Sequence, residues 1–117
     1  MNEYRFDEIQ IGQVEHFTKK ITLRMEEAFR EITGDLNPLH SDDEYARNIG
    51  NGRFKSHVTF GMLTASFYST LAGVYLPGKY SLIHSIDNIS FRNPVFEGDT
   101  LTVIGEVMAK QNDLQLI

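Results

Sequence analysis

The sequence predicts an α+β fold in which a curved antiparallel sheet wraps one long helix. Residues 60–72 carry apolar or small side chains on nearly every face, a pattern typical of a helix buried on all sides. Most of the chain that follows has strand-like patterning. At 117 residues the chain can form a single core with little to spare. Only a curved sheet could enclose such a helix in so small a protein, so we expect one domain over residues 1–117.

The N-terminal part predicts a strand and then an amphipathic helix. A short strand is expected over residues 14–18, after the turn that Gly12 marks. Thr22 is suited to cap the following helix, and Gly34 is suited to end it in a left-handed conformation. Apolar side chains within it recur at helical spacing: Met25, Ala28, Phe29 and Ile32.

The next six residues bring a carboxylate, a carboxamide and an imidazole together: Asp35, Asn37 and His40. Pro38 restricts Asn37 to extended geometry, which predicts an ordered turn. Taken alone the pattern has a purely structural interpretation, because Asp and Asn side chains bond nearby backbone amides in turns. The position of this pattern between the end of one helix and the capped start of the next also allows a functional interpretation.

Residues 41–44 have the pattern of a capping box and predict a short helix through Asn48. A mobile loop is expected over residues 49–55, with a basic pair at Arg53 and Lys55. Gly73 is expected to close the long helix.

The C-terminal part predicts strands. Residues 80–91 are rich in β-branched and aromatic side chains, and residues 100–109 alternate apolar with polar. A hairpin turn is expected at 111–113, with a further strand beginning at 114–117.

Composition excludes several classes of partner. The net charge of −5 argues against nucleic acid and anionic membrane surfaces. The chain has no cysteine, and residues 1–12 lack the pattern of a signal peptide. The longest apolar stretch, residues 59–74, is too short to span a bilayer. We therefore expect a soluble, cytoplasmic protein.

Three segments resemble those of the MaoC-like dehydratases and R-specific enoyl-CoA hydratases. Residues 33–40 are similar to the hydratase-2 motif, residues 61–66 to the entrance of the central helix, and residues 90–99 to a strand-and-turn segment. The resemblance extends from about residue 5 to the end. It implies a hotdog fold, assembly as a homodimer or higher homo-oligomer, and reversible syn hydration of a trans-2-enoyl thioester.

The resemblance also implies roles for particular residues. Asp35 and His40 match catalytic positions, and Asn37 would orient the water or a neighbouring side chain. Gly61 would offer its backbone N–H to the thioester carbonyl, and Ser69 matches a serine lining the acyl site. Phe60 and Met62 flank Gly61 and are candidates for substrate contact. Arg53 and Lys55 are candidates for contact with the coenzyme A phosphates, although a solvated loop is the favoured interpretation of this basic pair.

These residue types suit the chemistry. Hydration needs a base for the water proton and an acid for the α-carbon, and a carboxylate beside an imidazole can divide these tasks. An N–H at a helix N-terminus can stabilise the developing enolate oxygen. No metal or cofactor is expected beyond the coenzyme A of the substrate. His16, His57 and His84 show no metal-ligand spacing, which predicts surface or packing roles for them.

Two departures from the family pattern stand out. Phe60 occupies the position where a histidine usually precedes the oxyanion glycine. The family's domain also continues for one or two strands more, so we expect a trimmed piece, one domain of a longer fusion, or a minimal variant.

Two alternative functions are compatible with the sequence. A hotdog thioesterase would place its carboxylate on the central helix, where residues 61–72 contain no Asp or Glu. A non-catalytic assembly or binding domain would explain Phe60 but not the intact set of Asp35, Asn37 and His40.

Overall fold

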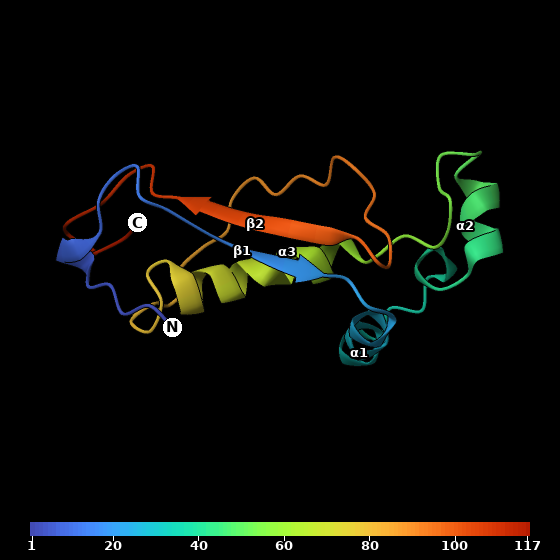
Figure 1. Cartoon of the computed structure of the whole chain (residues 1–117), viewed down its shortest axis with the longest axis horizontal. Helices are drawn as coiled ribbons and strands as arrows, with labels where there is room; N and C mark the ends of the chain where they lie inside the picture. Colours follow the sequence, from blue (N-terminus) through green and yellow to red (C-terminus); the bar gives the residue numbers. More distant parts are fainter. The chain divides into compact units, whose positions relative to one another are not determined.

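The computed structural model describes residues 1–117, which form two compact units built from segments distant in sequence. The first unit comprises Met1–Thr18, Ser66–Asn88 and Thr102–Ile117, and the second comprises Lys19–Ala65 and Ile89–Leu101. The helices and strands, labelled in Figure 1, are a 3-10 turn Phe6–Glu8, β1 Val14–Lys20, α1 Leu23–Thr33, a 3-10 turn Pro38–His40, α2 Asp43–Ile49, α3 Gly61–Thr70, a π-helical turn Leu71–Tyr75, and β2 Thr100–Glu106.

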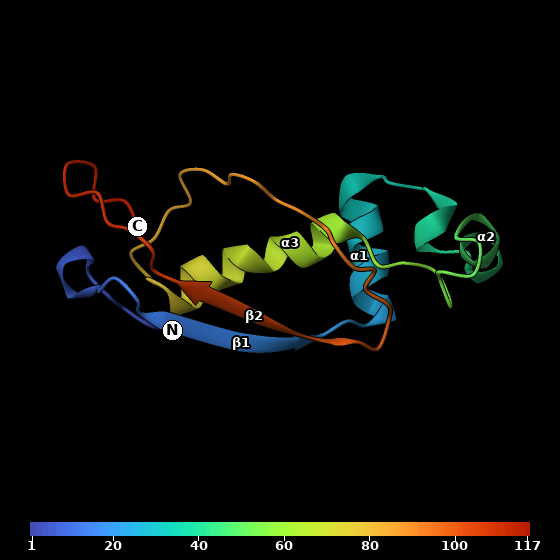
Figure 2. The same cartoon turned by 90° about the horizontal axis from the view of Figure 1, so that it is seen from above.

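Strands β1 and β2 pair in an antiparallel ribbon, whose two arrows lie side by side in Figure 2. In the first unit the N–H of Gly12 donates to the carbonyl of Val107 over 2.7 Å. In the second unit the N–H of Ile21 donates to the carbonyl of Asp99 over 2.8 Å. The strands therefore run in opposite directions, as an antiparallel sheet requires.

In the first unit the ribbon packs on the end of the long helix. A Cβ built on Gly105 of β2 would lie 2.6 Å from Cδ2 of Leu71, so only glycine permits this close approach. The rings of Phe17 and Tyr75 stack with centroids 4.9 Å apart. This arrangement of strand on helix agrees with the predicted α+β architecture.

Helix α1 has the predicted ends but not the predicted buried face. The hydroxyl of Thr22 accepts the N–H of Met25 over 3.3 Å, and Gly34 has a φ of 73°. Ile32, however, is 80% exposed, while Glu26 is completely buried. The apolar stripe failed as a guide because the Glu26 carboxylate is satisfied by hydrogen bonds inside the protein.

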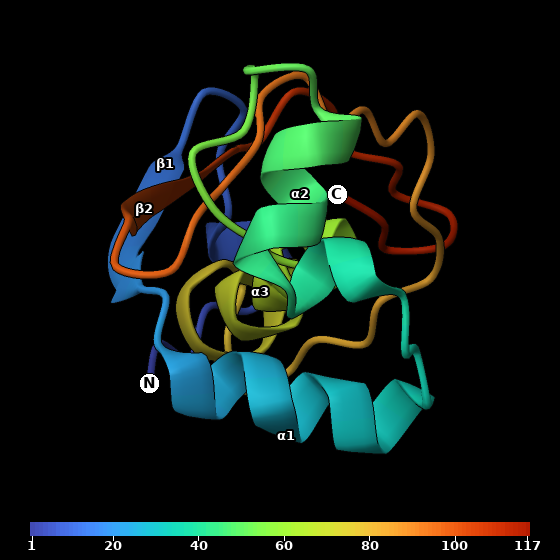
Figure 3. The ribbon, with the colours of Figure 1, turned by 90° about the vertical axis from the view of Figure 1, so that its right-hand side faces the viewer.

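Helix α2 begins one residue later than the capping-box pattern predicts. Its cap is Asp42, whose carboxylate accepts the N–H of Tyr45 over 2.9 Å. Ser41 instead caps the end of the preceding 3-10 turn, because its N–H donates to the carbonyl of Pro38. Figure 3 shows this turn between α1 and α2.

The long helix differs from the prediction at its end and on its faces. It continues as a π-helical turn through Tyr75, so Gly73 does not end it. Leu63, Phe67 and Leu71 form a buried stripe, whereas Met62 is 59% exposed. Burial on all sides was therefore wrong, because only this stripe of the helix is buried. No helix in the structure is long and apolar enough to cross a membrane.

The predicted strand at residues 80–91 is absent from the structure, and β2 ends at Glu106. A strand exists only where a neighbouring backbone completes its hydrogen bonds, and no such partner lies beside this segment. Its apolar side chains are accordingly exposed, Leu82 by 93%. The C-terminal hairpin is present as a single bridge between Gln111 and Leu116, so the strand expected at 114–117 reduces to one residue.

Candidate active site

The turn at residues 35–40 is ordered by its own side chains, as predicted. The carboxylate of Asp35 accepts the N–H of Asn37 over 3.0 Å, and the Asn37 side-chain oxygen accepts the N–H of Leu39 over 3.0 Å. Asn37 thereby caps the 3-10 turn in which Pro38 is the first residue. Each polar side chain holds the backbone near the next one. The direction of the His40 side chain is therefore defined.

His40 is held by one ring nitrogen and faces Asp35 with the other. Its Nδ1 lies 2.7 Å from the carbonyl oxygen of Val58, and because a carbonyl only accepts, Nδ1 carries the hydrogen. Nε2 lies 3.9 Å from Oδ2 of Asp35, too far for a direct hydrogen bond. A water molecule is the natural bridge across such a gap. The imidazole and the carboxylate therefore face a common position.

Phe60 supports the imidazole from behind. Its ring centroid lies 4.2 Å from that of His40 and 5.1 Å from that of Phe29, and it is 2% exposed. The residue that departs from the family pattern thus forms the apolar wall against which His40 rests.

Gly61 begins α3, where the first backbone N–H groups have no acceptor within the helix. A Cβ at this position would lie 3.1 Å from the ring of Phe91. The close approach of Phe91 explains why glycine suits the position, and the helix dipole favours negative charge at this N–H.

A cleft of about 580 Å³ lies within the second unit and includes both His40 and Gly61. Arg53, predicted as a substrate-binding residue, contributes to its wall, and so does Arg92, which the sequence analysis did not single out. The position of Arg92 inside the conspicuous segment 90–99 was the signal that could have found it. The remaining lining residues are Phe54, Val58, Thr59, Thr64, Phe91, Asn93, Pro94 and Val95.

Four predicted substrate-binding residues, Phe60, Lys55, Met62 and Ser69, do not line this cleft, and neither do Asp35 and Asn37 of the turn. Nζ of Lys55 lies 4.9 Å above the ring centroid of Phe96, and Lys55 is not a lining residue. Met62 points to solvent from the first turn of α3. Ser69 belongs to the first unit and is exposed.

His57 is the main functional candidate that the sequence analysis missed. Its Nδ1 lies 2.6 Å from Oδ1 of Asp43, and its Nε2 lies 2.9 Å from Oε2 of Glu26. The hydroxyl of Thr59 donates to the other oxygen of Glu26 over 2.6 Å. We call Glu26, Asp43, His57 and Thr59 the buried network, in which Asp43 alone is open to solvent. The sequence spacing of His57 predicted only a surface or packing role, but the structure gives its ring two carboxylate partners.

The buried network favours a charged imidazole. Two carboxylates can both accept from one ring only if both ring nitrogens carry hydrogen. Burial lowers the pKa of His57, but the hydrogen bonds and negative charges of Asp43 and Glu26 outweigh it and raise the pKa above the ordinary 6.5. The backbone N–H of His57, and then its ring, lower the pKa of Asp43 below the ordinary 3.8.

The same cluster has the residue types of a metal site. Ligand atoms of Glu26, His57 and Glu97 lie within 4.8 Å of one another. Metal ligation would require an unprotonated ring nitrogen, however, and both nitrogens of His57 already bond carboxylates. The hydrogen-bonded imidazolium accounts for the geometry without an ion.

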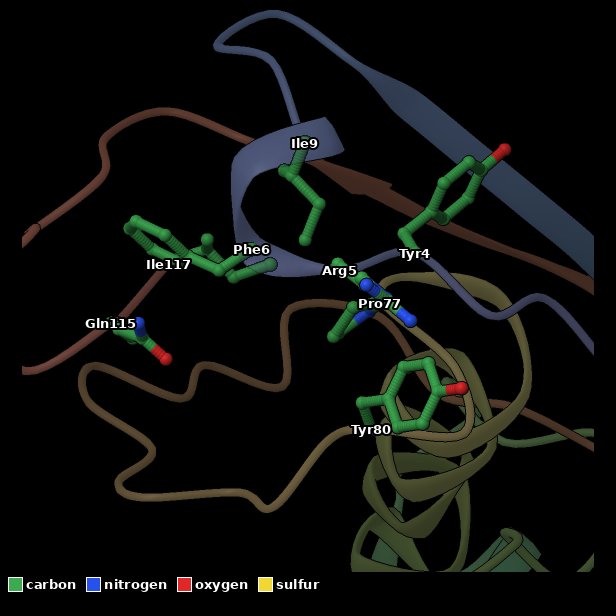
Figure 4. Close-up of a pocket in the computed structure, with 8 residues that line it drawn as sticks. All are labelled: Tyr4, Arg5, Phe6, Ile9, Pro77, Tyr80, Gln115 and Ile117. Carbon is green, nitrogen blue, oxygen red and sulfur yellow. The ribbon is translucent and has the colours of Figure 1, made fainter.

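A second cavity, of about 340 Å³, lies in the first unit between the N-terminal 3-10 turn and the C-terminal hairpin (Figure 4). Its walls include Arg5 and Tyr80 but neither a histidine nor a carboxylate. It therefore lacks the histidine that lines the cleft of the second unit.

The chain matches the family model described as "MaoC like domain" over residues 8–116. It is 37% identical over 105 residues to the (R)-specific enoyl-CoA hydratase of Aeromonas caviae, covering 90% of this chain and 75% of that protein. It is 32% identical over 102 residues to the 3-hydroxybutyryl-CoA dehydratase of Methylorubrum extorquens, covering 87% of this chain and 62% of that protein.

Two solved structures are similar in fold as well as sequence. The (R)-hydratase of A. caviae has a TM-score of 0.79 at 37% identity, covering 90% of this chain and 76% of that one. R-hydratase PhaJ1 of Pseudomonas aeruginosa also has a TM-score of 0.79, at 33% identity, covering 92% and 66%. These likenesses define the fold as a hotdog fold, which confirms the expected fold class. Within that class the chain belongs to the MaoC-like domain family.

Proposed function

We propose that this protein catalyses the reversible syn hydration of a trans-2-enoyl thioester to the R-3-hydroxyacyl thioester. The observation that carries the proposal is the paired arrangement of Asp35 and His40, whose Oδ2 and Nε2 lie 3.9 Å apart, so that one water beside the pair can bond both atoms. The hydratase and dehydratase activities named for the relatives support the same reaction class.

The pair performs a balanced proton transfer. As the water oxygen bonds to the β-carbon, the pair takes one proton from the water. It returns one proton to the α-carbon on the same face of the double bond and so ends in its starting protonation state. Because Nδ1 of His40 is bonded to the Val58 carbonyl, Nε2 is the ring nitrogen that takes part.

The N–H of Gly61 stabilises the enolate oxygen that forms on the thioester carbonyl. Donors of this kind are typically worth about 2.7–4 kcal/mol of barrier. Base, acid and oxyanion donor all come from the chain, so the reaction needs no cofactor beyond the thioester itself.

The substrate is an acyl-CoA or an acyl-carrier thioester, whose phosphates would meet the two arginines of the cleft wall, Arg53 and Arg92. We further propose that the protein acts in the cytoplasm as a homodimer or higher homo-oligomer, as the family resemblance implies.

The test is the ultraviolet absorbance of a short trans-2-enoyl-CoA mixed with the purified protein, followed by chiral analysis of the product. Loss of the conjugated absorbance, with R-3-hydroxyacyl product and no free thiol, is expected. Asp35→Asn and His40→Ala should each reduce turnover by about 10²–10⁴-fold, the range of general acid–base catalysis, while leaving the circular dichroism spectrum unchanged.

The same assay separates the competing functions. Release of free coenzyme A would replace the hydratase assignment with a thioesterase. Wild-type turnover in either variant would show that the pair has been assigned wrongly.

A further inference from the structure

We infer that His57 is a positioning residue whose positive charge holds the segment carrying the catalytic groups. The inference rests on the proposed function, because the groups it positions are those of the hydration reaction. His57 itself is buried and lies outside the lining of the cleft.

The buried network clamps residues 57–59 between two helices. The backbone N–H of His57 and its Nδ1 both bond the carboxylate of Asp43 on α2, over 2.9 and 2.6 Å. Its Nε2 bonds Glu26 on α1, and Thr59 bonds the same carboxylate two residues later. The residue enclosed between these anchors is Val58.

Val58 in turn holds the catalytic histidine. Its carbonyl accepts Nδ1–H of His40, and its N–H donates to the carbonyl of Leu39 over 2.9 Å. The next residues along the chain are Phe60, which supports the His40 ring, and Gly61, which supplies the oxyanion donor. A shift of residues 57–59 would therefore displace the base and the donor together.

The positive charge matters because carboxylates surround the ring from three segments. They are Glu26 from α1, Asp43 from α2 and, at 3.8 Å, Glu97 from the loop before β2. The positive charge of Arg47, also on α2, helps to lower the pKa of Asp43. A neutral ring can donate to only one carboxylate, so loss of the proton would break one anchor and leave repelling charges.

Substitution at position 57 separates charge from bulk. His57→Gln keeps hydrogen-bonding atoms but no charge, and His57→Arg restores a permanent cation. We expect His57→Gln to lower kcat by about tenfold or more with a smaller change in KM, because misplacement of 1 Å can cost about 10²-fold. His57→Arg should recover most of the loss. His16→Gln, at an exposed position in the first unit, is the matched control and should behave as wild type.

The pH profile gives a readout that a merely structural role would not move. Wild-type kcat should fall on the alkaline side as His57 loses its proton, and the His57→Arg protein should lack this limb. Asp43→Asn removes one of the carboxylates that raise the His57 pKa, so the limb should move to lower pH. If His57→Gln does not fold, the shift of the alkaline limb in Asp43→Asn still tests the role of the His57 charge.

Nitrogen-15 NMR of the histidine rings tests the inference without the hydration assay. Both nitrogens of His57 should be protonated at neutral pH, and His40 should be a single Nδ1–H tautomer that becomes mixed in His57→Gln. Failure of the wild type to hydrate any enoyl-CoA would count against the proposed function but leave this measurement decisive. Equal defects in the Gln and Arg variants would overturn the inference, as would stoichiometric Zn²⁺ binding to an unprotonated His57.

Discussion

Phe60 is the apolar support of the His40 ring. It lies between Phe29 and His40 and is almost fully buried. Phe60→Ala should therefore lower the free energy of unfolding by about 3–5 kcal/mol, the usual cost of emptying a buried aromatic site. Phe60→Leu should cost less than the alanine change, because it leaves a smaller cavity. Urea denaturation measures both, and a loss well below 1 kcal/mol for the alanine variant would contradict the packing described.

The contact between Gly61 and Phe91 predicts a second residue-level effect. In Gly61→Ala the new methyl group would meet the Phe91 ring at 3.1 Å and displace the first turn of α3. We expect kcat to fall about tenfold or more, since small misplacements of catalytic groups are costly. Adding Phe91→Leu should restore part of the activity. Gly73→Ala is the control, because a Cβ there would meet nothing within 4 Å.

Local chemistry determined which site residues could be predicted. The turn that carries Asp35, Asn37 and His40 could be predicted because its side chains bond backbone two residues away, and the family resemblance of residues 33–40 then implied its catalytic role. His57 was missed because its partners, Glu26 and Asp43, are 31 and 14 residues distant. No spacing rule connects such positions. The assignment of catalytic roles within the turn stays a prediction.

At the scale of elements, β2 packs against the end of the long helix through the close contact between Gly105 and Leu71. Gly105→Ala should lower the free energy of unfolding by about 1–3 kcal/mol, because the added methyl group overpacks against Leu71. Ile104→Ala, on the exposed neighbouring residue, should change it by no more than about 0.5 kcal/mol. Combining Gly105→Ala with Leu71→Val should cost less than the sum of the two changes. Strict additivity would mean that the two side chains do not touch.

Elements with local signals were predicted better than those that depend on partners. The ends of α1 follow from Thr22 and Gly34, whose bonds and backbone angles are set within one turn. The segment 80–91 has the composition of a strand, yet nothing in its own sequence supplies the neighbour that a strand needs. The same limit explains why burial around the long helix was overestimated.

At the scale of the whole molecule, the buried network makes stability depend on pH in both directions. The raised pKa of His57 means that its contribution is complete below 6.5 and is lost as pH rises through the folded-state value. The lowered pKa of Asp43 means that its contribution is present above 3.8 and is lost as pH falls through the folded-state value. Between these limits both contributions are present.

Urea denaturation at several pH values measures this dependence. The free energy of unfolding should decline above neutral pH in the wild type and decline less in His57→Arg. An identical alkaline decline in both proteins would mean that other groups cause it. The single-domain organisation, the cytoplasmic location and the homo-oligomer remain predictions at this scale.

The buried position of Glu26 also constrains which substitutions this chain can accept. Removing one partner of a buried ion pair typically costs about 3–5 kcal/mol, whereas replacing the whole pair with apolar residues of similar volume is often neutral. A lineage therefore cannot leave this arrangement through a single substitution at position 26 or 57 without passing through a poorly stable intermediate. Among related sequences we expect an acid at position 26 to accompany a cation at position 57, and an apolar residue at one to accompany an apolar residue at the other. Position 43, half open to solvent, should be freer to vary.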